Sequence, residues 1–154
     1  LSRGRTARSL AYLMKNYRNV RIVFIAPIAF TMERDILDHL DEHGIPYTVT
    51  TDLTEVIADL DALYVTRIQA EHDTEGESQK IDLSRFTISS KELAAMKEDA
   101  VIMHPLPRGP ELHREVDIDP RAKYWRQERN GMWMRAALLT RIFNAEAELY
   151  ALAQ

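Results

Sequence analysis

The sequence predicts an α/β domain, a doubly wound and mostly parallel five-stranded sheet with helices on both faces. The run from Arg21 to Ala26 is almost continuously apolar, as expected for a strand that is buried on both faces of a parallel sheet. Short apolar runs of this kind alternate with segments of helical periodicity along the chain. Pro27 ends the first run, and Gly44 stands where the helix before the second run should end.

The elements follow in alternating order. We expect strands at residues 21–26, 47–50, 62–65, 86–88 and 101–103. We expect helices at residues 6–17 capped by Thr6, 31–43 capped by Thr31, 53–58, 90–97 capped by Ser90, a region beginning at Asp119-Pro120, and 132–152. Residues 71–80 are polar and acidic, with a central glycine, which predicts a mobile loop.

Composition excludes several classes of protein. The 154 residues suit one domain, and a net charge of -4 argues against a general nucleic-acid or membrane binder. The absence of cysteine removes disulfides and thiolate chemistry and is compatible with a cytoplasmic location. No apolar run approaches the roughly 20 residues of a membrane span. The chain starts at Leu1 and enters a helix-start signal almost at once, so we expect a fragment or an excised domain.

In doubly wound folds, ligands bind beyond the carboxyl ends of the strands. After Val65 comes Thr66-Arg67-Ile68-Gln69. Arg67 offers a planar fork of donors to a carboxylate or phosphate, and Gln69 points the same way if the chain stays extended. A solvated arginine in a surface ion pair explains Arg67 equally well, so both interpretations stay open.

The last expected strand leads into His104-Pro105-Leu106-Pro107-Arg108. The prolines fix the backbone and lack N–H donors, so the carbonyls of this segment could face a substrate amine or amide. A rigid turn is the simpler interpretation. His104 could polarise a carbonyl or donate a proton, although a histidine beside a strand is more often a hydrogen-bonded structural residue.

Two further features have an ordinary explanation beside the functional one. Arg5 lies at a helix N-terminus, which favours anions, but an ordinary helix start with exposed arginines looks the same. His39 and His43 are four residues apart on a helix without an evident third ligand, and no metal site is predicted.

Four ordered segments together are more specific. They read Gly-Arg-Thr-x-x-Ser-Leu, then Leu-Tyr-x-Thr-Arg-x-Gln, then His-Pro-Leu-Pro-Arg, and finally Asp-x-Asp-Pro-Arg-Ala-x-Tyr with Arg-Gln-x-x-Asn-Gly-Met-x-x-Arg-x-Ala-Leu-Leu. In this order and spacing they resemble the catalytic chains of aspartate carbamoyltransferases. The match spans nearly the whole chain and identifies residues 1–154 as the aspartate-binding domain.

The resemblance implies a reaction in which the amine of L-aspartate attacks carbamoyl phosphate in pyrimidine biosynthesis, without a metal or organic cofactor. It implies that Arg5, Arg67 and Gln69 bind the two carboxylates of aspartate. It also implies that Pro105 and Leu106 offer backbone carbonyls to carbamoyl phosphate and the incoming amine, and that Pro107 shapes their loop. We therefore expect the Leu106–Pro107 peptide bond to be cis.

The same resemblance points to what this chain lacks. The family's Ser-Thr-Arg-Thr phosphate cradle belongs to an N-terminal domain, and no such motif occurs here. We expect the chain to be inactive alone and to need that domain, in a homotrimer of complete chains. In the family, the segment usually continues Arg-x-Gln-x-Glu-Arg, and its second arginine helps to hold a loop that closes over the site. This chain has His72 at that position, so we expect closure of the loop to be affected.

The final helix carries two apolar rows. One contains Met132, Trp133, Ala136, Leu139 and Phe143, and the other contains Leu138, Ile142, Ala145, Leu149 and Leu152. Two rows predict burial against two partners: the sheet of this domain should cover one, and the N-terminal domain should cover the other.

Two alternatives remain beside an aspartate carbamoyltransferase. An ornithine enzyme would resemble His-Cys-Leu-Pro at the loop where this chain has Pro105, and this chain has no cysteine. A non-catalytic binding or assembly domain with the same fold is the alternative from another class of protein.

Overall fold

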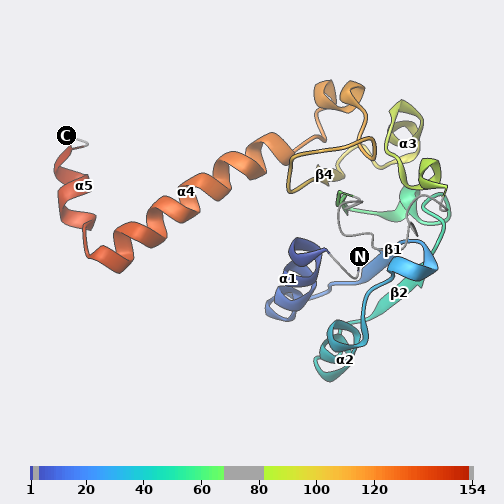
Figure 1. Ribbon diagram of the computed structural model, residues 1–154, viewed down its shortest axis with the longest axis horizontal. Helices are drawn as coiled ribbons and strands as arrows, with labels where there is room; N and C mark the ends of the chain where they lie inside the picture. The colour runs from blue at the N-terminus through green and yellow to red at the C-terminus, as the bar shows by residue number, and fades with distance from the viewer. Residues whose placement is uncertain (2–3, 68–81, 153–154) are drawn as a thin grey trace.

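The computed structural model describes residues 1, 4–67, 82–152 of the chain. Four strands are found within this part, in two parallel pairs: β1 (Ile22–Ile25) with β2 (Tyr47–Thr50), and β3 (Ala62–Tyr64) with β4 (Val101–Met103). Figure 1 shows the two pairs with helices beside them. The predicted α/β class with parallel strands is confirmed, because each pair joins strands that are separated along the chain by helical segments.

The prediction of a strand at residues 86–88 is wrong. Residues Leu83–Phe86 form a 3-10 helix, and Ile88 makes only an isolated bridge to Leu112. The Asp82 carboxylate accepts a hydrogen bond from the Ser84 N–H at 3.0 Å, which favours a turn over an extended chain. The described sheet residues therefore form two pairs rather than one five-stranded sheet.

The helices α1 (Arg5–Leu13) and α2 (Arg34–Glu42) lie where the sequence predicts helices, with different ends. Gly4 rather than Thr6 precedes α1, whose end is followed by a 3-10 turn at Met14–Asn16. Glu33 rather than Thr31 precedes α2. Gly44 has φ +64°, so the expected glycine after this helix is confirmed.

The middle of the chain contains less helix than predicted. The segment 53–58 gives only a 3-10 turn at Ile57–Asp59. Helix α3 (Ser90–Ala95) is capped by Ser89 instead of Ser90, in a capping box with Glu92. The helical region expected at Pro120 is also displaced: a 3-10 helix at Arg114–Ile118 comes before Pro120, and the next α-helix starts at Tyr124.

The expected final helix is two helices, α4 (Tyr124–Phe143) and α5 (Glu146–Leu152). Asn144 separates them with φ +53°, a left-handed conformation that asparagine adopts more readily than most residues. We call residues 124–152 the C-terminal arm, because it extends away from the rest of the molecule (Figure 1). Within the described residues, no helix is long and apolar enough to cross a lipid bilayer.

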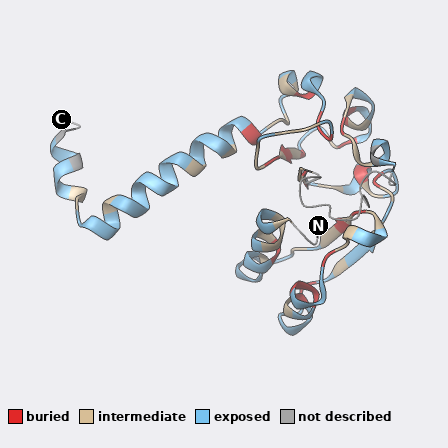
Figure 2. Cartoon of the chain, viewed as in Figure 1, coloured by how far each residue is buried: buried red, intermediate tan, exposed pale blue. Residues whose placement is uncertain are grey.

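The prediction that the sheet would cover one apolar row of this helix is wrong. Tyr124 is the only buried residue of α4, and Figure 2 shows the rest of the arm as mostly exposed. Large apolar residues of both rows are more than half exposed, among them Trp133 at 62%, Leu138 at 57% and Phe143 at 74%. The side chains of Leu149 and Leu152 lie outside the described residues. The side chain of Gln127 still reaches the residue after β4. The two apolar rows begin at Met132, where α4 already extends away from the sheet (Figure 1).

Buried residues form two clusters, one for each strand pair. The first joins α1, β1 and α2 through residues such as Ala11, Phe24 and Leu40. The second joins β3, β4 and α3 through residues such as Leu63, Ile102 and Leu93. Each strand pair therefore has its own core, and the second core supports the loops described next.

Candidate functional site

The candidate site lies at the carboxyl ends of β3 and β4. The Val65 N–H donates to the carbonyl of Met103, the last residue of β4, at 2.9 Å, so the parallel pairing continues one residue beyond β3. The segment that contains Arg67 therefore leaves the sheet beside the loop that starts at His104. Both segments follow strand ends that the sequence analysis selected as candidate ligand sites.

The loop after β4 has an unusual backbone at its centre. Leu106 has φ +48°, and the Leu106–Pro107 bond is cis, which confirms the sequence-based expectation. Pro105 and Leu106 are half-buried and Pro107 is exposed. A leucine in the left-handed region is sterically disfavoured, so neighbouring contacts must hold it there.

One set of contacts comes from His104 and Glu111, both buried. The Leu106 N–H donates to Nδ1 of His104 at 2.9 Å. The other ring nitrogen, Nε2, lies 2.9 Å from Oε1 of Glu111, which also accepts from the Gly109 N–H at 2.7 Å. On the other side, the His104 N–H donates to the side-chain oxygen of Gln127 on α4 at 3.1 Å.

A second set holds the end of the loop. Arg108 pairs with Asp117 through both guanidinium NH₂ groups, one of them at 2.7 Å from Oδ2. The hydroxyl of Tyr124 donates to the same carboxylate. The hydrogen bonds from Arg108 lower the pKa of Asp117, whereas burial, followed by its bond to Asp117, raises the pKa of Tyr124. The three side chains form a charge-assisted group that fixes the loop against the start of α4.

We call the start of α1, where Arg5 is the first residue, the second wall of the predicted site. Its side chain is exposed, and none of the described residues pairs with it. The nearby Arg8 forms an ion pair with Glu33 at 3.2 Å and with Asp35, which ties α1 to the start of α2. Arg5 is thus held in place by its helix while its guanidinium faces solvent.

Arg67 is half-buried and takes part in interactions within the protein, three residues beyond the end of β3. Gln69 and His72 lie outside the described residues, so their proposed roles stay predictions.

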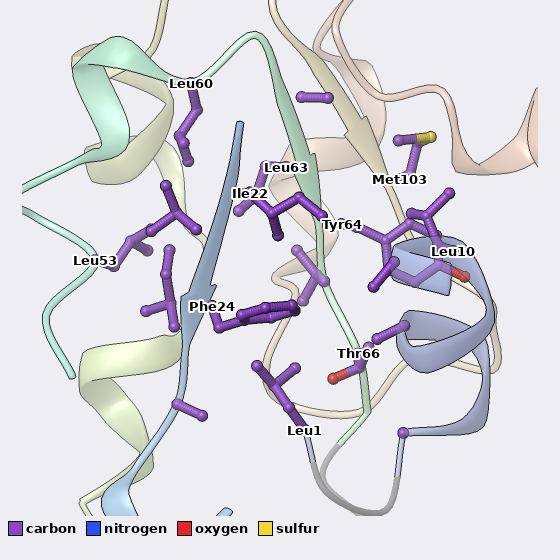
Figure 3. A pocket seen from close by; sticks show the side chains of 18 of the residues that line it. Leu1, Leu10, Ile22, Phe24, Leu53, Leu60, Leu63, Tyr64, Thr66 and Met103 are labelled. Carbon is purple, nitrogen blue, oxygen red and sulfur yellow. The ribbon is translucent and has the colours of Figure 1, made fainter. Parts of the chain in front are cut away.

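A cavity of about 710 Å³ separates the two strand pairs. Its lining is mostly apolar and includes Phe24 and Ile22 from β1, and Tyr64 and Thr66 from β3 and the segment after it (Figure 3). Gly4 and Arg67 also line it, but Arg5 and residues 105–107 do not. The start of α1 and the segment after β3 therefore border the same cavity, whereas residues 105–107 lie outside its lining.

A separate cluster on α2 was not predicted in full. Glu42 joins His39 and His43, and one ligand atom from each lies within 4.8 Å of the others. The sequence analysis identified the two histidines, but a glutamate three residues after His39 on an acidic helix is too common to single out. The cluster belongs to α2 and not to the loops at the strand ends.

Sequence reasoning also missed the residues that support the loop. Glu111 lies outside the motifs quoted for the family. Asp117 and Gln127 stand within those motifs, but the sequence analysis assigned no role to either residue. Their roles depend on the way the chain folds back after β4. A signal was present for Asp117 and Gln127, because both belong to the segments that carry the family resemblance.

Comparison of the chain with known proteins identifies its family. The family described as "Aspartate/ornithine carbamoyltransferase, Asp/Orn binding domain" matches residues 2–142. The chain is 43% identical over 144 residues to a chloroplastic aspartate carbamoyltransferase of Oryza sativa subsp. japonica, covering 90% of this chain and 39% of that protein. It is 39% identical to the aspartate carbamoyltransferase catalytic subunit of Vibrio campbellii, covering 94% of this chain and 46% of that one.

Solved structures agree. Aspartate transcarbamoylase from Trypanosoma cruzi, in complex with carbamoyl aspartate and phosphate, superposes with a TM-score of 0.79 at 37% identity, covering 88% of this chain and 44% of that chain. This chain thus spans less than half the length of the relatives described here. It belongs to the aspartate/ornithine carbamoyltransferase family, as an aspartate/ornithine-binding domain.

Proposed function

We propose that this chain is the aspartate-binding half of an aspartate carbamoyltransferase that serves pyrimidine biosynthesis. In the reaction, the amine nitrogen of L-aspartate forms a bond to the carbonyl carbon of carbamoyl phosphate. The bond from that carbon to the phosphate oxygen breaks, the nitrogen loses a proton, and carbamoyl aspartate and phosphate leave. The observation that carries the proposal is the loop after β4, whose carbonyl-bearing residues sit beside the segment with Arg67.

Within this proposal, Arg5, Arg67 and Gln69 bind the carboxylates of aspartate. Arginine suits this role because its planar fork makes two parallel hydrogen bonds to one carboxylate. Two arginines allow both carboxylates to be read, which disfavours substrates that lack one of them. Pro105 and Leu106 supply backbone carbonyls to the carbamoyl group and the incoming amine, and Pro107 maintains their direction. Positioning of this kind accelerates a reaction without a cofactor.

The C-terminal arm is the part of the chain that we assign to the N-terminal, carbamoyl-phosphate domain. Its exposed side chains include large apolar residues, which usually mark an interaction surface when they are contiguous. They are Trp125, Met132, Trp133, Met134, Leu138, Leu139, Ile142 and Phe143. We infer that complete chains assemble as a homotrimer, and we place the enzyme in the cytoplasm, although the plant relatives are named as chloroplastic.

Reconstitution tests the function. The chain alone is expected to give no turnover of labelled carbamoyl phosphate with L-aspartate, whereas the chain joined to a carbamoyl-phosphate domain should produce carbamoyl aspartate. Ornithine in place of aspartate is the substrate control, and Arg67→Ala is the control for the site. Binding of aspartate without turnover in the joined protein would favour the alternative of a non-catalytic binding or assembly domain.

Light scattering tests the role of the arm. The isolated chain is expected to self-associate through the arm, and substitution of Trp133 and Phe143 by serine should reduce that association. A monodisperse wild-type monomer would contradict the assignment of this surface to a partner domain.

A further inference from the structure

We propose that His104 and Glu111 form a positioning pair that sets the direction of the Pro105 and Leu106 carbonyls. This inference rests on the proposed function, because it assigns a role in the reaction to residues that support the substrate loop. His104 is then a positioning residue, which acts on carbamoyl phosphate through the loop and does not touch the substrate itself.

The hydrogen bonds determine the tautomer of the His104 ring. A backbone N–H can only donate, so Nδ1 of His104, which lies 2.9 Å from the Leu106 nitrogen, must offer its lone pair. In the neutral ring, the proton is then on Nε2, which donates to Oε1 of Glu111 at 2.9 Å. A ring protonated on both nitrogens would lose the bond to Leu106. The carboxylate therefore selects the one tautomer that can hold the loop, as an acceptor beside a functional histidine does.

Glu111 is suited to this task because it stays ionised in a buried place. Burial alone raises the pKa of Glu111, but the hydrogen bonds from His104 and the Gly109 N–H outweigh it and lower the pKa below its ordinary value. Its second oxygen, Oε2, is buried without a hydrogen-bond partner among the described residues. An unpaired buried carboxylate oxygen is unfavourable, so packing alone does not account for a glutamate at this position. A role beyond packing explains its presence.

The conformation of Leu106 is what the pair maintains. A leucine with φ +48° is disfavoured sterically, and a free loop would relax toward negative φ. Such a relaxation would rotate the peptide planes on both sides of Leu106 and turn the carbonyls of Pro105 and Leu106. The bond from the Leu106 N–H to His104 opposes this rotation directly.

The geometry argues against a direct catalytic role for His104. His104 is 1% exposed, and both of its ring nitrogens already have partners within the domain. A substrate would have to displace Leu106 or Glu111 to reach either nitrogen. The ring can influence the reaction only through the backbone that it holds.

Two substitutions at the same position separate positioning from packing. In His104→Asn, the side-chain oxygen occupies the place of Nδ1 and can still accept from the Leu106 N–H. In His104→Gln, the amide group reaches the place of Nε2 and keeps contact with Glu111, but it leaves the Leu106 N–H without its acceptor. Both variants lose the imidazole ring, so a role in packing alone would penalise them similarly.

The complete enzyme, with its N-terminal domain, is used for two measurements. Hydrogen exchange at the Leu106 amide reports the bond itself, and kcat and KM for carbamoyl phosphate report its effect on the reaction. His104→Gln should exchange faster at Leu106 and raise KM by about tenfold relative to His104→Asn, as expected for loss of one hydrogen bond. The exposed His113→Asn serves as a control, with wild-type exchange and kinetics expected.

The two measurements also separate this inference from the proposed function. Equal exchange at Leu106 in the Asn and Gln variants would overturn the positioning pair, whether or not the enzyme is active. Different exchange with identical KM would overturn its role in the reaction. A wild-type enzyme that forms no carbamoyl aspartate would instead contradict the proposed function, while the exchange experiment still decides whether the pair holds the loop.

Discussion

The two walls of the proposed site are built differently. The loop after β4 presents backbone carbonyls, and the residues beside them are held by His104, Glu111 and Asp117 before any ligand arrives. The wall at the start of α1 presents Arg5, which is exposed and has no partner among the described residues. One wall is therefore organised by the fold, whereas under the proposed function Arg5 becomes ordered only when aspartate binds.

The difference follows from the chemistry of the groups. A carbonyl cannot rotate independently of the backbone, so its direction must be fixed by the contacts of the loop. A guanidinium sits at the end of a flexible side chain and can turn to a carboxylate when one binds, at the cost of side-chain entropy. Substitutions in the two walls should consequently affect different properties of the protein.

The largest effect is expected on aspartate binding. Arg5→Ala and Arg67→Ala should each weaken aspartate binding by about 1.5–3 kcal/mol in the complete enzyme, roughly tenfold or more, because each removes a charged hydrogen-bonding partner. Arg5→Ala should change the free energy of unfolding by less than about 0.5 kcal/mol, because its side chain is exposed. Isothermal titration with aspartate and urea unfolding measure the two quantities.

Arg18→Ala provides the matched control, since Arg18 is also exposed but lies outside the proposed site. It should change neither quantity. If Arg5→Ala behaved like Arg18→Ala in the titration, Arg5 would be an ordinary surface arginine, and the contrast between the two walls would disappear.

The second effect is on stability and belongs to the loop wall. Asp117→Ala leaves both Arg108 and the Tyr124 hydroxyl without their acceptor, and it should lower the free energy of unfolding by about 1–3 kcal/mol. Tyr124→Phe removes one of these bonds and should cost about 1 kcal/mol. Urea unfolding of the chain measures both losses.

Asp38→Ala is the control for an acidic residue in an ion pair. Asp38 pairs with Arg34 at 2.7 Å, but the two side chains are 54% and 76% exposed, and such pairs contribute little. If Asp117→Ala were no more destabilising than Asp38→Ala, the loop would not depend on its charged group.

The same contrast explains which parts of the site could be predicted. Arg5 and Arg67 follow from residue type and position at a helix start or a strand end, and Pro105 to Pro107 follow from a short local motif. Asp117 and Gln127 lie in segments that carry the resemblance, and Glu111 does not. The supporting roles of all three residues could not be predicted, because each acts only after the chain has turned back on itself. Local sequence carries no direct record of such contacts.

The fold was predictable to a similar degree. Hydrophobic periodicity placed β1 to β4 and the helices near α1 to α3, since burial determines both the pattern and the structure. The expected strand at 86–88 failed because an Asp82 turn competes with extension. The expected covered row on the C-terminal arm failed because periodicity reports an apolar face without saying which partner covers it.

The smallest effect concerns pH and tests the loop wall alone. The hydrogen bonds from Arg108, ahead of that from Tyr124, lower the pKa of Asp117 in the folded protein despite the opposing effect of burial. In the unfolded chain an aspartate titrates near pH 4. Between pH 4 and the lower folded value, the unfolded chain binds the proton more readily than the folded protein does. The stabilisation is thus complete above about pH 4 and disappears as the pH falls through the folded pKa.

Asp117→Asn cannot titrate, so it should lack this part of the acid dependence. Because the Asp117 side chain is 29% exposed, solvent screens its ion pair with Arg108. We therefore expect the acid-dependent loss in the free energy of unfolding to differ between the two proteins by less than about 1 kcal/mol. Urea unfolding of both proteins from pH 2.5 to 6 (roughly the window in which aspartates titrate) should show curves that converge at the acid end. Asp52, Asp61 and Asp119 also have lowered pKa values, so both proteins will still lose stability in acid. Parallel curves over the whole range would mean that Asp117 gains no more from Arg108 in the folded protein than in the unfolded chain.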